Sequence, residues 1–424
     1  MRYAGVVSLP VLLQPFRARN YRLFFGGQVV SLIGTWMTQT ATLWLVYQLS
    51  GSAALLGVLA MATQIPSFLA APLGGVLVDR FNRHRLLLLT QAASLVQSAL
   101  LAIFAWMGML DLPHLVVLGV MQGCINAVDL PARQAAVVEF VEDKHLLAAA
   151  IAMNSSLFNL ARLIGPAVAG FLLAGFGAAW CFTLDAVSYL AVLAGLLAMR
   201  VKPFTPRPHL RHPWVELRES LAYVRNYRPI RVLIAMVAVH SMLGMGYSVL
   251  APVMAKDIFR GDARILGFLM SASALGSVFG GLYLGSRRRI RGLGRIIVAG
   301  GLLSTAGLAG YALSRNYALT LVFLMITGTG GIWVIASCNT VVQTLVDDEM
   351  RGRVMSLFGM AFIGTMPFGS LLLGYLAQHW GAPAALGVCA AGTLVSSLVF
   401  LSVLPGLRAA ASEKMARIEP LEIT

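Results

Sequence analysis

The stretch Gly75-Val76-Leu77-Val78-Asp79-Arg80-Phe81-Asn82-Arg83-His84-Arg85 connects two long apolar runs, which occupy residues 54 to 78 and 86 to 109. Each run is close to the roughly 20 apolar residues with which an α-helix crosses the hydrocarbon of a bilayer. The connection carries three arginines, one histidine and one aspartate. A short charged turn between two such runs predicts a pair of helices that span a membrane.

The rest of the chain repeats this pattern. Of its 424 residues, 58% are apolar and only 12% are charged, and the mean hydropathy is +0.79. Because a soluble domain carries about 25% charged residues, the composition excludes an ordinary soluble protein and predicts an all-α integral membrane protein. Twelve runs are long enough to be transmembrane helices: 21 to 49, 54 to 78, 86 to 109, 114 to 139, 146 to 175, 180 to 200, 229 to 254, 264 to 285, 293 to 313, 317 to 345, 353 to 378 and 382 to 406.

The formal net charge of +15 raises the question of a nucleic-acid partner. Its distribution argues against one, because basic residues gather in every second connection, at 79 to 85, 200 to 231 and 287 to 291. Connections rich in Lys and Arg stay in the cytoplasm. We therefore predict no nucleic acid, the lipid bilayer as partner, and both termini in the cytoplasm.

The long connection between the sixth and seventh runs divides the chain into related halves. The spacing from Gly170 to Gly177 recurs from Gly374 to Gly381. Four prolines in the connection precede apolar residues at helical spacing, which predicts a helix on the membrane surface or a solvated linker helix. The predicted organisation is a cytoplasmic N-terminal tail (1–20), a six-helix bundle (21–200), a cytoplasmic linker with an amphipathic helix (201–228), a second six-helix bundle (229–407) and a cytoplasmic C-terminal tail (408–424).

The charged stretch between the second and third runs resembles motif A of the major facilitator superfamily, from which only His84 departs. The resemblance implies the major facilitator fold, with 12 transmembrane helices in two pseudo-symmetric six-helix halves. It also implies a cytoplasmic gate, in which Asp79 meets the positive N-terminus of the eleventh helix. The residues of this gating motif are Gly75, Asp79, Arg80, Arg83 and Arg85. A purely topogenic role for the arginines is the alternative.

Two further stretches, Asp129-Leu130-Pro131-Ala132-Arg133-Gln134-Ala135 and Asn339-Thr340-Val341-Val342-Gln343, are similar to the enterobactin-exporter and macrolide-efflux group of that superfamily. This group is the third drug–proton antiporter group, of the transmembrane secretion effector type. The resemblance implies that a monomer exports an amphipathic, siderophore-like or drug-like small molecule across a bacterial-type inner membrane by alternating access. It implies exchange for protons, with the proton gradient as energy source and no cofactor.

The fifth run contains Gly165-Pro166-Ala167-Val168-Ala169-Gly170, which resembles the antiporter motif of the superfamily but lacks its second terminal glycine. Proline breaks one backbone hydrogen bond and can kink a helix, and glycines permit close packing. We therefore add Gly165, Pro166 and Gly170 to the gating residues. Packing alone, without a role in gating, is the alternative.

Ionisable residues inside hydrocarbon are costly and mark functional sites. Asp129 is the first candidate for proton coupling, with Arg162 for charge balance. Asp185 is second, because it lies near the outer end of its run. His240 can titrate near neutrality, although a histidine bonded to a neighbouring helix is equally compatible with this position.

Polar residues at helical spacing predict the walls of a substrate cavity. Gln122, Asn126, Asp129 and Arg133 are spaced by four, three and four residues and therefore share a face of the fourth helix. The resemblance implies that the first, fourth, seventh and tenth helices line the path. The cavity candidates are Thr35, Thr38, Gln122, Asn126, Arg133, Asn159, Trp333, Ser337 and Thr340. Hydrogen bonding between helices is the alternative for the hydroxyl groups.

The sequence carries no HExxH, GxSxG or P-loop motif and no CxxC pair, so we predict neither an enzyme with catalytic residues nor a metal site. Two other functions stay open. A facilitator that moves lysophospholipid between leaflets would show an apolar side pocket for the acyl tail. A binding or sensing protein would use the same fold without net transport.

Overall fold

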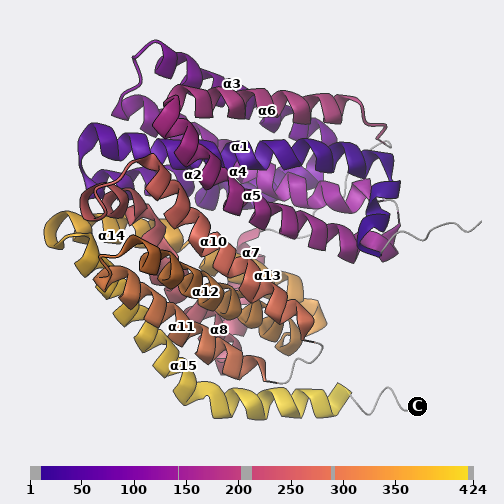
Figure 1. Cartoon of the computed structure of the whole chain (residues 1–424). Helices are drawn as coiled ribbons and strands as arrows, with labels where there is room; N and C mark the ends of the chain where they lie inside the picture. The colour runs from indigo at the N-terminus through magenta and orange to yellow at the C-terminus, as the bar shows by residue number, and fades with distance from the viewer. Residues whose placement is uncertain (1–10, 142, 202–212, 288–291, 419–424) are drawn as a thin grey trace, which may run out of the picture. The chain divides into compact units, whose positions relative to one another are not determined.

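The computed structural model describes residues 11–141, 143–201, 213–287 and 292–418 (Figure 1). Within these residues the chain is almost entirely helical and has no strand. Twelve segments are long and apolar enough to cross a membrane, which confirms the predicted all-α fold with 12 transmembrane helices. The first half of the predicted N-terminal tail (1–10), residues 202–212 of the linker and the end of the C-terminal tail (419–424) lie outside the described residues.

The first six spans are six continuous helices. A 3-10 helix, η1 (Val11–Arg17), comes before them and another, η2 (Lys144–Leu146), comes after the fourth. The spans are α1 (Arg19–Ser50), α2 (Ala53–Arg80), α3 (Arg83–Trp106), α4 (Leu112–Phe140), α5 (Leu147–Gly175) and α6 (Ala178–Leu197). Polar caps start two of them: Asn82 accepts the Arg85 N–H at 3.2 Å, and Asp111 accepts the His114 N–H at 3.1 Å.

The later spans include two interrupted helices. After α7 (Pro213–Asn226), the seventh span consists of α8 (Arg228–Gly244), η3 (Gly246–Leu250), α9 (Ala251–Val253) and the π-helical turn η4 (Met254–Ile258). The eleventh consists of α13 (Asp348–Ile363) and α14 (Met366–Trp380). The other spans are α10 (Ala263–Ser286), α11 (Leu293–Leu313), α12 (Tyr317–Leu345) and α15 (Ala382–Ile418).

Proline accounts for the interruption of the eleventh span. The ring of Pro367 would clash with the carbonyl four residues earlier, and its nitrogen has no proton to donate. Side chains bridge the interruption to the seventh span: Ser241 Oγ donates to the Phe362 carbonyl, and Thr365 Oγ1 donates to the Ala238 carbonyl at 3.0 Å. These bonds use backbone oxygens in a region where water is scarce.

The chain divides into two compact units, Met1–Ala41 with Leu69–His209, and Thr42–Phe68 with Leu210–Thr424. In the first unit α3 packs against both α4 and α6 (Figure 1). In the second, α12 packs against α10 and α11, and α15 packs against α11 and α8. Each unit has its own apolar core, around Phe140 in the first and Val334 in the second.

Helix α7 packs against the start of α13 within the second unit. Arg353 Nη1 donates to Glu219 Oε2 at 2.5 Å, and Tyr223 OH donates to Asp347 Oδ2 at 2.9 Å. Partial burial and the hydrogen bond to Asp347 raise the pKa of Tyr223 above its usual value. These contacts attach the segment between the two six-span halves to the first turn of the eleventh span.

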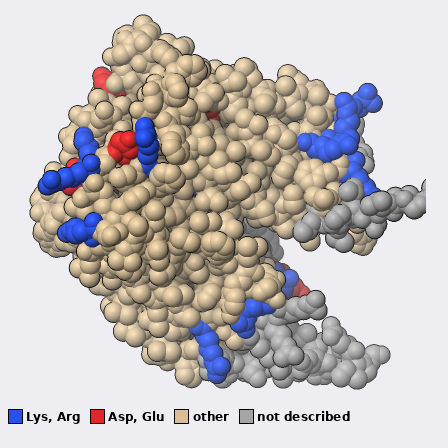
Figure 2. All heavy atoms as spheres, in the orientation of Figure 1, with Lys and Arg blue, Asp and Glu red and all other residues tan. Residues whose placement is uncertain are grey.

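The surface matches a hydrocarbon environment. Figure 2 shows a broad area of uncharged side chains on the face drawn, with charged side chains in a few separate groups. Large apolar side chains are exposed along the spans, such as Leu89 at 67%, Val117 at 64% and Leu282 at 67%. In water such exposure would be unfavourable, whereas in lipid it carries no such penalty.

Candidate functional site

The carboxylate of Asp129 is the most extensively bonded acidic group in the described part of the first unit. The residue is 3% exposed. Its Oδ1 accepts hydrogen bonds at 2.7 Å from both Thr90 Oγ1 and Gln91 Nε2 on α3. Its Oδ2 accepts from Arg133 Nη2 at 2.5 Å, one turn later on α4. A buried charge is tolerated when it is paired and bonded in this way.

Arg133 extends the cluster to a third helix. Its Nη1 donates to the amide oxygen of Gln28 on α1, a residue that is 2% exposed. The Arg133 side chain itself remains 22% exposed. Asp129 and Arg133 therefore connect α1, α3 and α4 through charged hydrogen bonds, which are stronger than neutral ones. Arg162, the other predicted cation, lies partly buried on α5.

A second carboxylate, Asp185 on α6, is 1% exposed. Its Oδ2 accepts hydrogen bonds at 2.8 Å from Thr38 Oγ1 on α1 and from Ser98 Oγ on α3. Its Oδ1 is buried and accepts no hydrogen bond from the described residues. A Cβ on Gly34 would lie 2.6 Å from this oxygen, so α1 passes directly over it. Asp185 thus has polar partners but no basic partner among the described residues.

Helix α3 contributes polar residues that the sequence analysis did not single out. They are Thr90, Gln91, Ser94, Gln97 and Ser98, and none is more than 8% exposed. The spacing of one, three, three and one residues places them on one face of a helix. This helical spacing is visible in the sequence, but the third helix is not among the path-lining helices that the family resemblance implies. We call these five residues the α3 stripe.

The cavity candidates of the first unit form hydrogen bonds within their own helices and to neighbouring helices. Gln122 Nε2 donates to Asn126 Oδ1 at 3.0 Å and to Ser94 Oγ at 3.3 Å. Thr35 Oγ1 lies 3.4 Å from Tyr189 OH. Asn159 donates only along α5, to the Ser155 carbonyl at 2.8 Å. Gln122, Asn126, Thr35 and Asn159 are all partly buried.

The candidates of the second unit are more scattered. His240 on α8 is 1% exposed, and its Nε2 has no partner among the described residues. Helix α12 passes close to it, since a Cβ on Gly331 would lie 3.5 Å from this nitrogen. Ser337 Oγ is buried without a described partner, whereas Thr340 is exposed and bonded to the Ala336 carbonyl of its own helix.

Trp333 packs between helices. Its indole N–H donates to the Gly280 carbonyl of α10 at 3.1 Å, and its ring lies against Tyr283 with centroids 4.9 Å apart. These contacts join α12 to α10 and give Trp333 a role in packing between helices.

Replacing Trp333 with phenylalanine is therefore expected to lower the free energy of unfolding by about 1 kcal/mol, the contribution of one hydrogen bond. Thermal unfolding in detergent measures the change. Trp380→Phe is the control, because Trp380 is 65% exposed. Equal unfolding temperatures of Trp333→Phe and the wild type would instead show that these contacts contribute little to stability.

The described part of the gating motif bonds to neighbouring helices of the first unit. Arg83 Nη1 lies 3.6 Å from Glu139 Oε2 on α4, and His84 Nε2 lies 2.8 Å from the Leu196 carbonyl on α6. Arg80 and Arg85 are exposed. The side-chain surroundings of Gly75 and Asp79 lie outside the described residues.

Gly74, beside the gating motif, and Gly165, one of the gating residues, both mark close helix contacts. A Cβ on Gly74 would lie 1.9 Å from the Ala127 carbonyl oxygen of α4. A Cβ on Gly165 would lie 2.5 Å from the Trp36 Cβ of α1. Gly165, Pro166 and Gly170 are all buried, and α5 remains continuous through Pro166. The motif of the fifth helix therefore lies in a tightly packed face.

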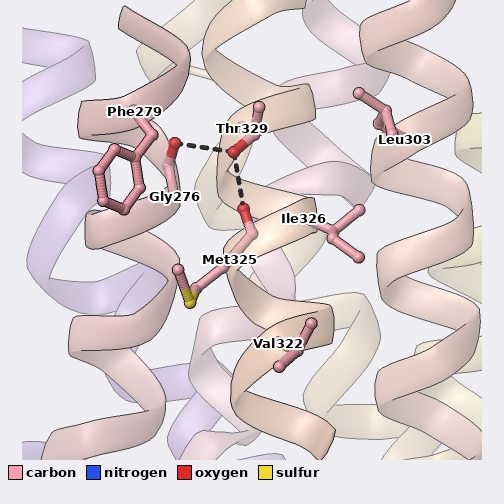
Figure 3. A pocket seen from close by; sticks show the side chains of 7 residues that line it. All are labelled: Gly276, Phe279, Leu303, Val322, Met325, Ile326 and Thr329. Atoms are coloured by element: carbon pink, nitrogen blue, oxygen red, sulfur yellow. Dashed lines mark hydrogen bonds between the residues drawn. The ribbon is translucent and has the colours of Figure 1, made fainter. Parts of the chain in front are cut away.

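A cavity of about 320 Å³ lies between α10, α11 and α12 (Figure 3). Its lining is apolar apart from Thr329, whose hydroxyl is bonded to the carbonyls of Gly276 at 2.8 Å and Met325 at 2.9 Å. Phe279 and Leu303 border the same space from α10 and α11. Neither a charged group nor an unsatisfied hydroxyl lines it, so it suits a hydrocarbon group better than a polar one.

The end of α1 at Ser50 belongs to the second unit. There Tyr47 OH donates to the Asp257 carboxylate in the π-helical turn η4, and Lys256 Nζ lies 5.6 Å from the centre of the Tyr47 ring. At the start of α2, Ser52 Oγ donates to Gln378 Oε1 of α14 at 3.0 Å. Polar contacts therefore connect these ends of α1 and α2 to the seventh and eleventh spans.

Comparison with known families identifies this arrangement. The model of the family described as transmembrane secretion effector matches residues 11–423. The chain belongs to the transmembrane secretion effector family. Membership confirms the predicted resemblance to the major facilitator superfamily and identifies the chain as a transporter of small molecules rather than an enzyme.

Curated relatives of this transmembrane secretion effector match over almost its whole length. It is 24% identical to the staphyloferrin A transporter of Staphylococcus aureus over 380 residues, which are 89% of this chain and 95% of the relative. It is 26% identical to an enterobactin exporter of Shigella boydii over 392 residues, 92% of each chain. With its 12 spans, the transmembrane secretion effector is a multi-pass protein of a bacterial inner membrane.

Solved structures share the fold of this transmembrane secretion effector. A peptide transporter named POT superposes with a TM-score of 0.74 at 13% identity, covering 92% of this chain and 95% of that one. A bacterial homologue of the lysosomal transporter Spinster, solved facing inward, superposes with a TM-score of 0.67 at 14% identity, covering 95% and 98%. At this identity the likeness extends to the fold alone.

Proposed function

We propose that this transmembrane secretion effector exports a siderophore-like, amphipathic small molecule in exchange for protons, by alternating access. The names of the curated relatives support the cargo class, because they are a transporter of staphyloferrin A and exporters of enterobactin. The matches extend over nearly the whole chain, so the helices that would surround a cargo are all included.

The hydrogen-bonded carboxylate of Asp129 is the observation that best supports proton coupling. In its ionised form it holds Arg133, Thr90 and Gln91 by charge-assisted hydrogen bonds. A proton on Asp129 would remove its attraction to Arg133 and weaken the links between α1, α3 and α4. Binding and release of a proton would therefore change how firmly these helices are held together, which is what coupling to alternating access requires.

Arg162, Asp185 and His240 are the other proposed coupling residues. Asp185 and His240 are both buried within spans and each has an atom that lacks a described partner. A proton could bind at either atom without displacing a hydrogen bond. Arg162 would balance the charge of a carboxylate in the same unit.

The proposed cargo contacts are Thr35, Thr38, Gln122, Asn126, Arg133 and Asn159 in the first half, with Trp333, Ser337 and Thr340 in the second. Their amides, hydroxyls and guanidinium suit the oxygen-rich groups of a siderophore. Gly75, Asp79, Arg80, Arg83 and Arg85, with Gly165, Pro166 and Gly170, would form the gate. We further propose cytoplasmic termini, two pseudo-symmetric bundles at 21–200 and 229–407, and a monomer.

Proteoliposomes loaded with a pH-sensitive dye test the proposed function. They are challenged in turn with enterobactin, a macrolide and a lysophospholipid. We expect enterobactin to move protons at a rate well above that of protein-free liposomes, because cargo and protons cross in exchange. Absence of proton movement with every compound, from protein that still unfolds cooperatively, would contradict the proposal.

A lipid facilitator is the second candidate, which the apolar cavity between α10, α11 and α12 favours. An acyl tail would fit this cavity, but its seven lining residues include no charged group for a headgroup. Transfer of lysophospholipid between leaflets without proton movement would support this candidate and oppose siderophore export.

A further inference from the structure

We infer that the α3 stripe is a proton path through the first unit, with Asp185 at one end and Asp129 at the other. The inference rests on the proposed proton coupling. It adds the route of the proton, which then runs along α3 between the two carboxylates.

The two ends of the stripe have different partners. Asp129 carries an ion pair with Arg133 and two further hydrogen bonds, so its negative charge is compensated. Among the described residues, Asp185 accepts hydrogen bonds only from the hydroxyl groups of Thr38 and Ser98, and no basic side chain is bonded to it. Burying an unpaired charge is costly, and a proton on the open Oδ1 removes that charge. Asp185 is therefore the carboxyl that holds the proton before it is transferred.

Hydrogen bonds connect the stripe to both ends. Ser98 donates to Asp185 and also lies 3.3 Å from the amide oxygen of Gln97. One turn away, Ser94 accepts from Gln122 of α4 at 3.3 Å. A further turn along α3, Thr90 and Gln91 reach Asp129 at 2.7 Å. The polar groups thus follow α3 without an intervening apolar turn on this face.

Three oxygens along this route accept no hydrogen bond from any residue that the structure describes. They are Asp185 Oδ1, Gln122 Oε1 and Gln91 Oε1, and all three are buried. Buried polar atoms in proteins are nearly always hydrogen-bonded, and ordered water supplies the partner where the protein does not. The open acceptors therefore mark positions for water. From Gln91 to Ser98 the helix rises about 11 Å, a length that about four water molecules in a row can bridge.

The transfer itself breaks and makes only O–H bonds. The carboxylic acid of Asp185 gives its proton to the adjacent water, each water and hydroxyl passes one proton on while accepting another, and the Asp129 carboxylate becomes the acid. The hydroxyls of Thr90, Ser94 and Ser98 can take part because each donates and accepts. The titratable neighbours of the two carboxylates are Arg133, bonded to Asp129, and Tyr189 and Cys181 of α6, which interact with Asp185.

Infrared spectroscopy tests the path without any cargo. A protonated buried carboxyl gives a separate C=O band, which shifts when its proton is replaced by deuterium. We expect this band in the wild-type protein and its loss in Asp185→Asn. After rapid transfer to heavy water, Ser94→Val and Gln97→Leu should each slow the shift by about tenfold or more, equivalent to about 1.4 kcal/mol in the barrier.

Thr320→Val is the matched control, since it also replaces a buried hydroxyl by valine but lies on α12 of the second unit. It should exchange like the wild type. The path is overturned if both stripe variants exchange at the rate of the control, or if the wild type shows no band that depends on Asp185. Ser94 and Gln97 lie on successive turns, so either variant decides the test if the other does not fold. Failure of enterobactin to move protons would contradict the proposed function, but the infrared exchange rates could still be interpreted because they are measured without cargo.

Discussion

Asp129→Asn is expected to reduce enterobactin transport driven by a pH gradient by about 100-fold, the lower range of what loss of a proton-transfer group costs. Asparagine retains an oxygen for Thr90 but carries no charge for Arg133 and binds no proton near neutral pH. The links between α1, α3 and α4 would then no longer depend on protonation. Uptake of labelled enterobactin into proteoliposomes, with and without a pH gradient, measures the loss.

Asp111→Asn, at the N-cap of the same helix, is the matched control. Asp111 lies just before α4, where the His114 backbone N–H holds the pKa of its carboxyl below the usual range. Asparagine caps a helix about as well as aspartate, so transport should match that of the wild type. Full gradient-driven transport by Asp129→Asn would remove Asp129 from the coupling mechanism.

A second variant separates coupling from folding. Asp129→Asn leaves Arg133 without its counter-charge, and an unpaired buried charge is destabilising. In the double variant Asp129→Asn with Arg133→Gln both charges are absent, so part of the lost stability should return. Transport should remain low in the double variant, because the proton site is still missing.

Gly276→Ala is expected to lower the free energy of unfolding of the second unit by about 3 kcal/mol. The new Cβ would lie 1.9 Å from the Met325 carbonyl oxygen of α12 and 2.7 Å from the Met325 Cα. These atoms belong to the backbone and cannot rotate away. Gly328 faces the same crossing from α12, where a Cβ would lie 1.9 Å from the Ser273 carbonyl oxygen. The two helices would have to separate, which breaks the contacts between α10 and α12.

Gly281→Ala on the same helix is the control for this prediction. Nothing lies within 4 Å of a Cβ at Gly281, so the substitution should be neutral or raise stability by about 0.5 kcal/mol through helix propensity. Thermal unfolding of the purified protein in detergent compares the two variants. Equal unfolding temperatures would show that the crossing of α10 and α12 is looser than the backbone distances indicate.

The candidate site could be predicted from the sequence only where its members share a helix. Asp129 and Arg133 are four residues apart, and this spacing brings their side chains together on one face. Their partners Gln28, Thr90 and Gln91 come from α1 and α3. They are so far away in the sequence that helical periodicity cannot predict these contacts. From the sequence, Asp185 is only the second candidate for proton coupling, because it lies near the end of an apolar run. Its burial depends instead on how closely α1 and α3 pack over it.

The sequence by itself determined the number of membrane spans and the family, because hydrocarbon thickness sets the length of an apolar helix and the family motifs are local. It also held the period of the α3 stripe, although a period alone does not distinguish a buried polar face from an exposed one. Only the tertiary structure decided which polar groups meet, where the seventh and eleventh spans are interrupted, and which glycines are in contact. Those features depend on distances between helices, which arise from packing among residues far apart in the chain.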